Sequence, residues 1–102
     1  RLGTRGSVLL LIGWDDGDSV RKALGSTGLA AADVDIGQRL AAWLAPHDLA
    51  CTLRDGLWLV LATRERQDAI EQLAERIRFA IAEKPFGSAS GPLQVRASIA
   101  VV

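Results

Sequence analysis

An Asp-Gly pair between two apolar stretches constrains this chain more than any other feature. Asp55 and Gly56 separate residues 48–53 from residues 57–62. Asp-Gly is the strongest short-range signal for a β-hairpin, because both turn positions favour a positive φ. Residues 48–53 alternate polar and apolar side chains, which indicates a strand buried on one side, and residues 57–62 are apolar throughout, which indicates burial on both. We therefore predict a central strand at 57–62 and an edge strand at 48–53.

The short turn also predicts the register of the hairpin. With Asp55 and Gly56 in the turn, Arg54 pairs with Leu57. The cross-strand pairs that follow are Leu53–Trp58, Cys51–Val60 and Leu49–Ala62. Because side chains alternate along a strand, Leu53, Trp58 and Val60 are expected beneath the helices, and the opposite face receives Leu57, Leu59 and Leu61. Cys51, the only cysteine, is expected to be a small buried hydrophobe.

Helical periodicity marks the segments between the strands. Residues 29–45 place an apolar stripe on one face of a helix that Pro46 ends. Residues from 63 or 64 to about 83 form the clearest helix, and a short helix from about residue 18 to Leu24 precedes a break at 25–28. The stripes of the two long helices are Leu29, Ala32, Ile36, Leu40, Trp43 and Leu44 in the first, and Ile70, Leu73, Ala74, Ile77 and Ile81 in the second.

Two further stretches complete a four-stranded antiparallel sheet. Residues 8–12 are apolar throughout, and residues 93–101 alternate after a Gly/Ser/Pro loop at 85–92. The fold class is therefore α+β, with the first and third strands in the middle of the sheet. Right-handed crossovers put both long helices on one face, which is the split βαβ, ferredoxin-like arrangement. Residues 1–102 form a single domain.

Composition excludes several classes of function. Basic and acidic residues number 12 each, so the chain lacks the positive charge of a general nucleic-acid binder. RNA-binding sheets of this kind also need stacking aromatic residues on the central strands, and residues 8–12 have none. No apolar run is long enough for a membrane span, and no signal peptide is visible. We expect a cytoplasmic fragment of a longer protein that contacts neither nucleic acid nor membrane.

Isolated polar groups are expected to be structural. Asp15, Asp16 and Asp18 match no calcium loop and are best explained as a solvated turn with a helix cap. His47 is the only histidine and has no second ligand near it in the sequence, so we expect a surface loop position.

Several stretches resemble, in order and spacing, the GGDEF domains of bacterial diguanylate cyclases. The hairpin at 54–58 lies where that family carries its signature turn between two strands. Residues 73–78 resemble the helix after the signature, residues 97–100 its Ala-Ser-Ile-Gly strand, and residues 38–40 the end of its long second helix. The similarity runs from about Val8 to Val102 and implies a cyclase-palm fold of order βααββαβ.

Carried onto this sequence, the resemblance implies that the catalytic residues are absent. Only the aromatic last position is kept among the five signature positions, which fall on Arg54, Asp55, Gly56, Leu57 and Trp58. Gly13 stands for the first-strand metal aspartate and Leu57 for the metal-binding glutamate. Other changed positions are Arg21 for a base-recognising asparagine, Ala30 for a guanine-binding aspartate and Ala45 for the arginine of an inhibitory product site. The retained positions are Asp15, Gly25 and Asp48.

The resemblance therefore implies a non-catalytic GGDEF domain without metal or cofactor. Joining two nucleoside triphosphates needs divalent metal, and leucine offers it no oxygen ligand. The implied role is regulation or protein interaction in cyclic-di-GMP signalling, in some relatives of type IV pili, motility or biofilm formation. Expected partners are neighbouring domains, an EAL domain among them, another protein or a second copy, with Leu57, Leu59 and Leu61 as the contact face. The alternatives are a ligand-sensing or GTP-sensing ferredoxin-like module and an active cyclase, against which the missing carboxylates argue.

Overall fold

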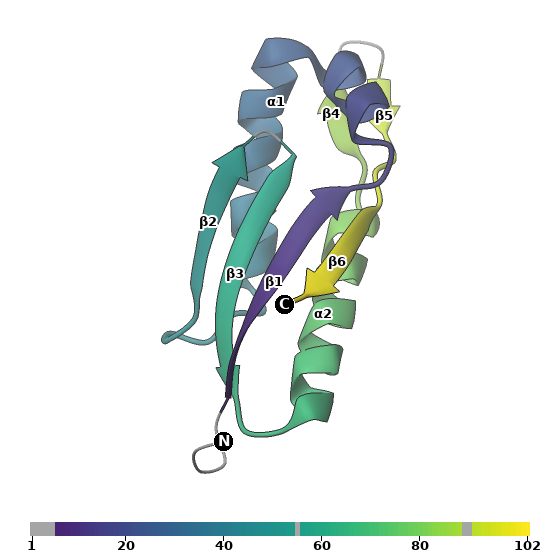
Figure 1. Cartoon of the computed structure of the whole chain (residues 1–102). Coiled ribbons are helices and arrows are strands. Elements are labelled where there is room, and N and C mark those ends of the chain that lie inside the picture. Colours follow the sequence, from purple (N-terminus) through teal and green to yellow (C-terminus); the bar gives the residue numbers. More distant parts are fainter. Residues whose placement is uncertain (1–5, 55, 89–90) are drawn as a thin grey trace.

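The computed structural model describes residues 6–54, 56–88 and 91–102. Its elements are β1 (Gly6–Trp14), α1 (Gly17–Ala41), β2 (Leu49–Arg54), β3 (Leu57–Arg64), α2 (Gln67–Ala82), β4 (Phe86–Ser88), β5 (Gly91–Leu93) and β6 (Ala97–Val101). The main sheet is antiparallel and has the order β2-β3-β1-β6, which confirms the two predicted central strands. Both helices lie on one face of this sheet (Figure 1). The predicted α+β class is confirmed.

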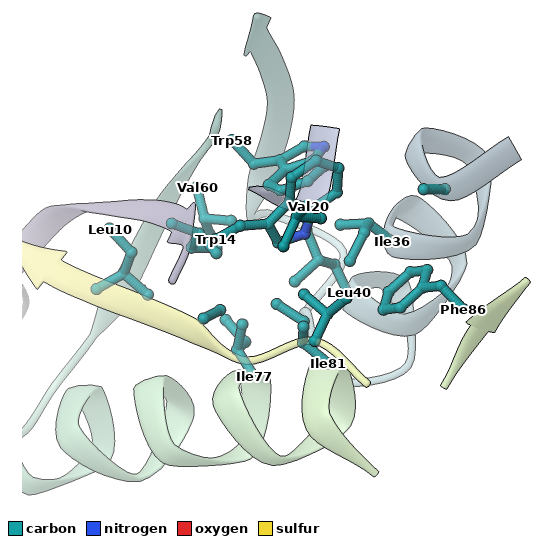
Figure 2. Packing of buried hydrophobic residues seen from close by; sticks show 14 of the residues in the cluster. Leu10, Trp14, Val20, Ile36, Leu40, Trp58, Val60, Ile77, Ile81 and Phe86 are labelled. Carbon is teal, nitrogen blue, oxygen red and sulfur yellow. The ribbon is translucent and has the colours of Figure 1, made fainter. Parts of the chain in front are cut away.

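The hydrophobic core fills the space between the sheet and the two helices (Figure 2). The sheet contributes alternate residues of its central strands, because only every second side chain points toward the helices. Fully or nearly fully buried residues of the core include Leu10, Ile12, Trp58 and Val60 from the sheet, Ile36 and Leu40 from α1, and Ile77 and Ile81 from α2. The apolar stripes predicted from helical periodicity therefore face the sheet.

The hairpin register differs from the prediction by one residue on β2. Arg54 pairs with Leu57 as expected. A register shift between Thr52 and Arg54 changes every pair that lies farther from the turn. The observed pairs are Thr52–Trp58, Cys51–Leu59, Ala50–Val60 and Leu49–Leu61 in place of those predicted. An extra residue in one strand is a β-bulge, and the turn signal carries no information about it.

This register shift moves β2 side chains to the other face of the sheet. Leu53, expected beneath the helices, is 52% exposed. Cys51, expected to be buried, is exposed. Trp58 and Val60 are buried as predicted, because the bulge lies on β2 and leaves β3 unaffected.

The helices differ from their predicted bounds in three places. The predicted break at 25–28 is confirmed but is narrower, because only Gly25, with φ of 68° and ψ of 177°, is non-helical and divides α1 into two helical segments. Glycine adopts this backbone geometry without a Cβ clash. α1 ends at Ala41 and not at 45, which leaves Trp43 40% exposed beyond the helix. α2 begins only at Gln67, because β3 continues through Arg64. Neither helix has a described stretch long and apolar enough to cross a membrane.

The last part of the chain contains three strands where one was predicted. The predicted loop at 85–92 includes β4 and part of β5, which pair with each other as a separate hairpin. Phe86 of β4 is buried and lies under the guanidinium of Arg39 on α1, 4.1 Å from ring centroid to Cζ. The predicted strand at 93–101 is interrupted at 94–96. Alternation of polar and apolar residues does not show where a strand exchanges one partner for another.

Candidate functional site

The hairpin turn and the end of β1 meet at one end of the sheet. Gly13 and Leu57 are direct partners in the pairing of β1 with β3. A Cβ atom at Gly13 would lie 3.7 Å from Cδ1 of Leu57. The two positions that the resemblance assigns to metal-binding carboxylates are therefore neighbours in space. As glycine and leucine, they place no oxygen ligand there.

Side chains cover the backbone of Gly56 in the turn. Gly56 is buried and has the positive φ (80°) that the turn signal predicted, whereas Asp55 lies outside the described residues. A Cβ at Gly56 would meet Cε3 of Trp14 at 2.8 Å and Nη1 of Arg21 at 3.1 Å. The Trp14 amide also donates a hydrogen bond to the Gly56 carbonyl at 3.3 Å. Trp14 and Arg21 thus occupy the space beside Gly56.

Two tryptophans pack against each other beneath this turn. The rings of Trp14 and Trp58 form an edge-to-face pair with centroids 5.1 Å apart and an interplanar angle of 68°. Trp58 Nε1 donates to a carboxylate oxygen of Asp33 on α1 at 2.9 Å, and the Thr52 hydroxyl donates to the same oxygen at 3.1 Å. Trp14 Nε1 is buried and has no hydrogen-bond partner among the described residues. The aromatic residue at the last signature position is therefore anchored in the core.

Sequence reasoning did not identify Asp33 as part of this end of the molecule. Asp33 follows Ala32, a buried member of the predicted apolar stripe. A carboxylate beside the stripe of a helix is a signal for a hydrogen bond to the sheet, but nothing in the sequence indicates that Trp58 is its partner.

The other predicted positions near the turn are engaged with neighbours or exposed. Arg21 pairs with Asp18 one helical turn earlier. The Asp15 carboxylate accepts a hydrogen bond from the Ser98 hydroxyl, and its amide donates to the Arg96 carbonyl at 2.9 Å. The exposed positions are Arg54 at the end of β2, and Gly25 and Ala30 on α1. Within the described ranges, no three His, Cys, Asp or Glu residues gather as a metal-binding group.

The two product-site positions lie at the opposite end of the hairpin. The Asp48 side chain is fully buried and accepts hydrogen bonds from both terminal nitrogens of Arg64, each at 2.8 Å. The same carboxylate accepts from the backbone amides of Ala45 at 2.7 Å and Thr63 at 3.4 Å. The Arg64 hydrogen bonds are the main reason why the pKa of Asp48 falls to about 2. Asp48 is thus committed to joining the loop before β2 to the end of β3.

His47 lies in a loop, as predicted. Its side chain is half exposed, and its Nε2 lies 3.3 Å from the Thr63 carbonyl oxygen and 3.7 Å from Oδ1 of Asp48. Arg64, the partner of Asp48, was not singled out from the sequence. An arginine that ends an apolar strand is a signal for such an ion pair, although the sequence alone does not identify its carboxylate.

The sheet face opposite the helices is rich in leucine, and Arg54 at the end of β2 pairs with Leu57 of this face. Register and alternation place there Leu9 and Leu11 of β1, Leu57, Leu59 and Leu61 of β3, and Leu49 and Cys51 of β2. Leu49 is 64% and Leu61 37% exposed. That this face contacts another protein stays a prediction.

No family model and no curated protein matches this chain. Among solved structures it resembles the GGDEF domain of TpbB, also named YfiN, from Pseudomonas aeruginosa, with a TM-score of 0.82, 19% identity and coverage of 96% of this chain and 57% of that one. It also resembles the diguanylate cyclase SiaD of Pseudomonas aeruginosa, solved with its activator SiaC, with a TM-score of 0.82, 22% identity and coverage of 97% and 38%. For an EAL/GGDEF domain protein from M. capsulatus the TM-score is 0.77 and the identity 19%, with coverage of 99% and 64%.

This chain spans between 38% and 64% of the length of these three chains. Identities at or below 22% establish likeness of fold. The predicted cyclase-palm arrangement agrees with that likeness. The protein has the fold of GGDEF domains.

Proposed function

We propose that this chain is a GGDEF domain without diguanylate cyclase activity, which regulates or recruits other parts of a cyclic-di-GMP signalling protein. The observation that carries the proposal is the pairing of Gly13 with Leu57. Joining two GTP molecules requires divalent metal to neutralise phosphate charge and to activate the attacking hydroxyl. The sequence resemblance assigns these two residues to positions where carboxylates would share that metal, and neither side chain supplies an oxygen ligand.

The residues around the turn support the proposal because they do not suit nucleotide binding. Trp14 and Arg21 cover Gly56 so closely that a methyl group would not fit beside its Cα. Ala30 has no acceptor for the hydrogen bonds of guanine, and a site that depends on such bonds loses much of its affinity without them. The Asp48 carboxylate already accepts hydrogen bonds from Arg64, Ala45 and Thr63. We therefore expect neither GTP nor cyclic di-GMP to bind at these positions.

The regulatory part of the proposal is supported by the comparisons and by the open face of the sheet. SiaD has a protein activator, and the M. capsulatus protein combines EAL and GGDEF domains. By analogy, the partner of this domain is a neighbouring domain of its parent protein, such as an EAL domain, or another protein. The leucine-rich face with Leu57, Leu59 and Leu61 is the contact surface, since apolar patches of several hundred Å² are rarely left exposed. More specifically, we propose that the parent protein controls type IV pili, motility or biofilm formation.

Product formation by the intact parent protein tests the catalytic part. Any other cyclase-like domain is first inactivated by mutation, and the protein is incubated with GTP and Mg²⁺ or Mn²⁺. Chromatography is expected to show no cyclic di-GMP, and calorimetry no specific binding of GTP at micromolar protein. Enzyme-dependent product would falsify the proposal, and tight guanine-selective binding without product would favour a GTP sensor instead.

A pair of double variants tests whether the missing carboxylates are the cause. Gly13→Asp with Leu57→Glu places two carboxylates on directly paired residues, and this variant is expected to bind Mn²⁺ more tightly than the parent protein. Gly13→Asp with Leu59→Glu is the matched control, because Leu59 pairs with Leu11 and not with Gly13. Equal Mn²⁺ affinity in both variants would show that the two positions do not form one site.

A further inference from the structure

β2 lies at one edge of the main sheet, and its outer side has no partner strand among the residues that the structure describes. The Trp14 amide donates to the Gly56 carbonyl, so even-numbered residues along β3 point their backbone groups toward β1. Odd-numbered residues of β3 therefore bond to β2, and Cys51 is one of their partners. Because hydrogen-bonded pairs alternate along antiparallel strands, Ala50 and Thr52 point their N–H and C=O groups outward.

Residues 49–53 at this edge are nearly symmetrical about Cys51. They read Leu-Ala-Cys-Thr-Leu, and all of them are exposed. A second copy that pairs antiparallel about Cys51 brings Leu49 close to Leu53 of the partner subunit. Both leucines have more than half of their surface exposed, at 64% and 52%. Such a self-complementary surface, in which each copy presents the same residues to the other, is what a two-fold dimer requires.

The features that protect an edge strand from further pairing lie outside this stretch. Bulges and charged residues are the usual protection. On β2 these are the register shift between Thr52 and Arg54 and the charge of Arg54 itself, both at the turn end of the strand. Residues 49–53 are uncharged, so antiparallel pairing about Cys51 brings no like charges together. The chain has 12 basic and 12 acidic residues, so two copies meet without net repulsion.

A stripe of small uncharged residues on α1 extends this surface beyond the sheet. Ala30, Val34, Gly37 and Ala41 recur at helical spacing and are exposed, Val34 at 63%. Asp33, which is hydrogen-bonded to β2, lies one helical turn from Ala30 and from Gly37. The stripe therefore borders β2 on the helix-covered side of the sheet (Figure 1). Small side chains here leave room for the close approach of a second helix.

We propose that β2 pairs antiparallel with β2 of a second copy of this chain, with Cys51 at the two-fold axis and the two α1 stripes in contact. Ala50 and Thr52 of each copy exchange backbone hydrogen bonds with the same two residues of the partner subunit. Cys51 faces its counterpart in a pair without hydrogen bonds, in which the Cα atoms lie about 4.5 Å apart. The two sheets become one, and the leucine-rich face of each copy stays open. This pairing goes beyond the proposed function, which assigns contacts to that face.

Disulfide cross-linking of the intact parent protein tests the register. Every other cysteine is replaced by serine, and an added oxidant takes up the two protons and two electrons that a pair of thiols releases as the S–S bond forms. A Cα separation of about 4.5 Å lies within the range of about 4.4–6.8 Å that a disulfide bridges. We expect a covalent dimer through Cys51, measured as a rate on non-reducing gels.

Leu49→Cys combined with Cys51→Ala is the matched control. It moves the thiol by two residues along the same face of the same strand, to a position that is 64% exposed. In the proposed register the two introduced thiols lie four residues apart along the paired strands, or ~13 Å. Cross-linking of this variant is expected to be at least ~10-fold slower than through Cys51.

Val34→Arg, with Cys51 kept, tests the contact between the α1 stripes. It places a positive charge on each stripe, and we expect the rate of cross-linking through Cys51 to fall by ~10-fold or more. Gln72→Arg is the control, because it adds the same charge at an exposed position of α2. This control is expected to cross-link at the rate of the unchanged protein.

Two results would overturn the proposal. The first is cross-linking through Cys51 that is absent or no faster than in the Leu49 variant, which would reduce it to chance collisions of exposed thiols. The second is equal rates in the Val34 and Gln72 variants, which would mean that the α1 stripes do not meet. Neither measurement involves GTP, cyclic di-GMP or the leucine-rich face, so failure here is distinguishable from failure of the proposed function.

Discussion

The two ends of the β2–β3 hairpin use polar chemistry in opposite ways. At the base, the buried Asp48 carboxylate receives two hydrogen bonds from Arg64 and two from backbone amides. At the turn, Gly13 faces Leu57, and tryptophans fill the space beneath. A buried carboxylate persists only where it is paired and hydrogen-bonded, because desolvation is otherwise unfavourable. This hairpin thus keeps its buried charge where the charge joins chain segments, and has apolar packing where metal chemistry would need carboxylates.

Breaking the base of the hairpin is expected to have the largest effect. Arg64→Ala leaves Asp48 buried without its strongest partner, and we expect a loss of about 3 kcal/mol in the free energy of unfolding. Urea denaturation, followed by the tryptophan fluorescence of the domain, measures it. Arg66→Ala is the control, because Arg66 forms an exposed ion pair with Asp68 and its loss is expected to go undetected. Equal stability of the two variants would mean that the Asp48–Arg64 pair contributes no more than a surface ion pair does.

The same ion pair predicts a dependence of stability on pH. The pKa of Asp48 is about 2 in the folded protein, below the ordinary value of 3.8. A lowered folded-state pKa stabilises the protein above the unfolded value, and this contribution, about 2 kcal/mol, is lost as pH falls from about 4 to 2. Asp48→Asn is expected to lack this acid-sensitive step in denaturation curves. An unchanged step would assign the acid sensitivity to other carboxylates.

The turn end of the hairpin is expected to be destabilised by an added methyl group. Gly56→Ala combines a φ of 80° with a Cβ contact of 2.8 Å to Trp14, and we expect destabilisation by about 2 kcal/mol. Gly37→Ala is the control, because a Cβ there meets no atom within 4 Å and lies in α1. Thermal unfolding should show the control to be neutral or stabilised by up to ~1 kcal/mol. If Gly56→Ala were as stable as the control, Trp14 would not pack closely against Gly56.

The smallest effect is expected from the two tryptophans, which separate hydrogen bonding from packing. Trp58→Phe loses the bond to Asp33, whereas Trp14→Phe removes an N–H that has no partner among the described residues. We expect Trp58→Phe to be the less stable variant by about 1 kcal/mol, since a satisfied hydrogen bond contributes and an orphaned donor does not. Chemical denaturation of both variants gives the difference. The opposite ranking would indicate that ring volume outweighs the Asp33 bond.

Some of this arrangement follows directly from residue order. The apolar run 57–62 predicted a central strand, and Trp58 and Val60 are buried accordingly. The prediction for the edge strand was wrong in register, because the bulge near Thr52 depends on how β2 meets its neighbour and leaves no local signal. The resemblance also aligned Gly13 with a metal position from sequence order, and the strand pairing places it beside Leu57.

By itself, the sequence determined which segments are apolar and with what period, and therefore the strand order and the helix-covered face of the sheet. Local patterns suffice for this, because burial demands apolar residues at intervals set by the backbone. Only the tertiary structure decided the partners of single side chains: Asp33 with Trp58, Arg64 with Asp48, and Trp14 over Gly56. These contacts join residues from 16 to 42 positions apart, and their geometry depends on how whole elements pack, which no local pattern encodes.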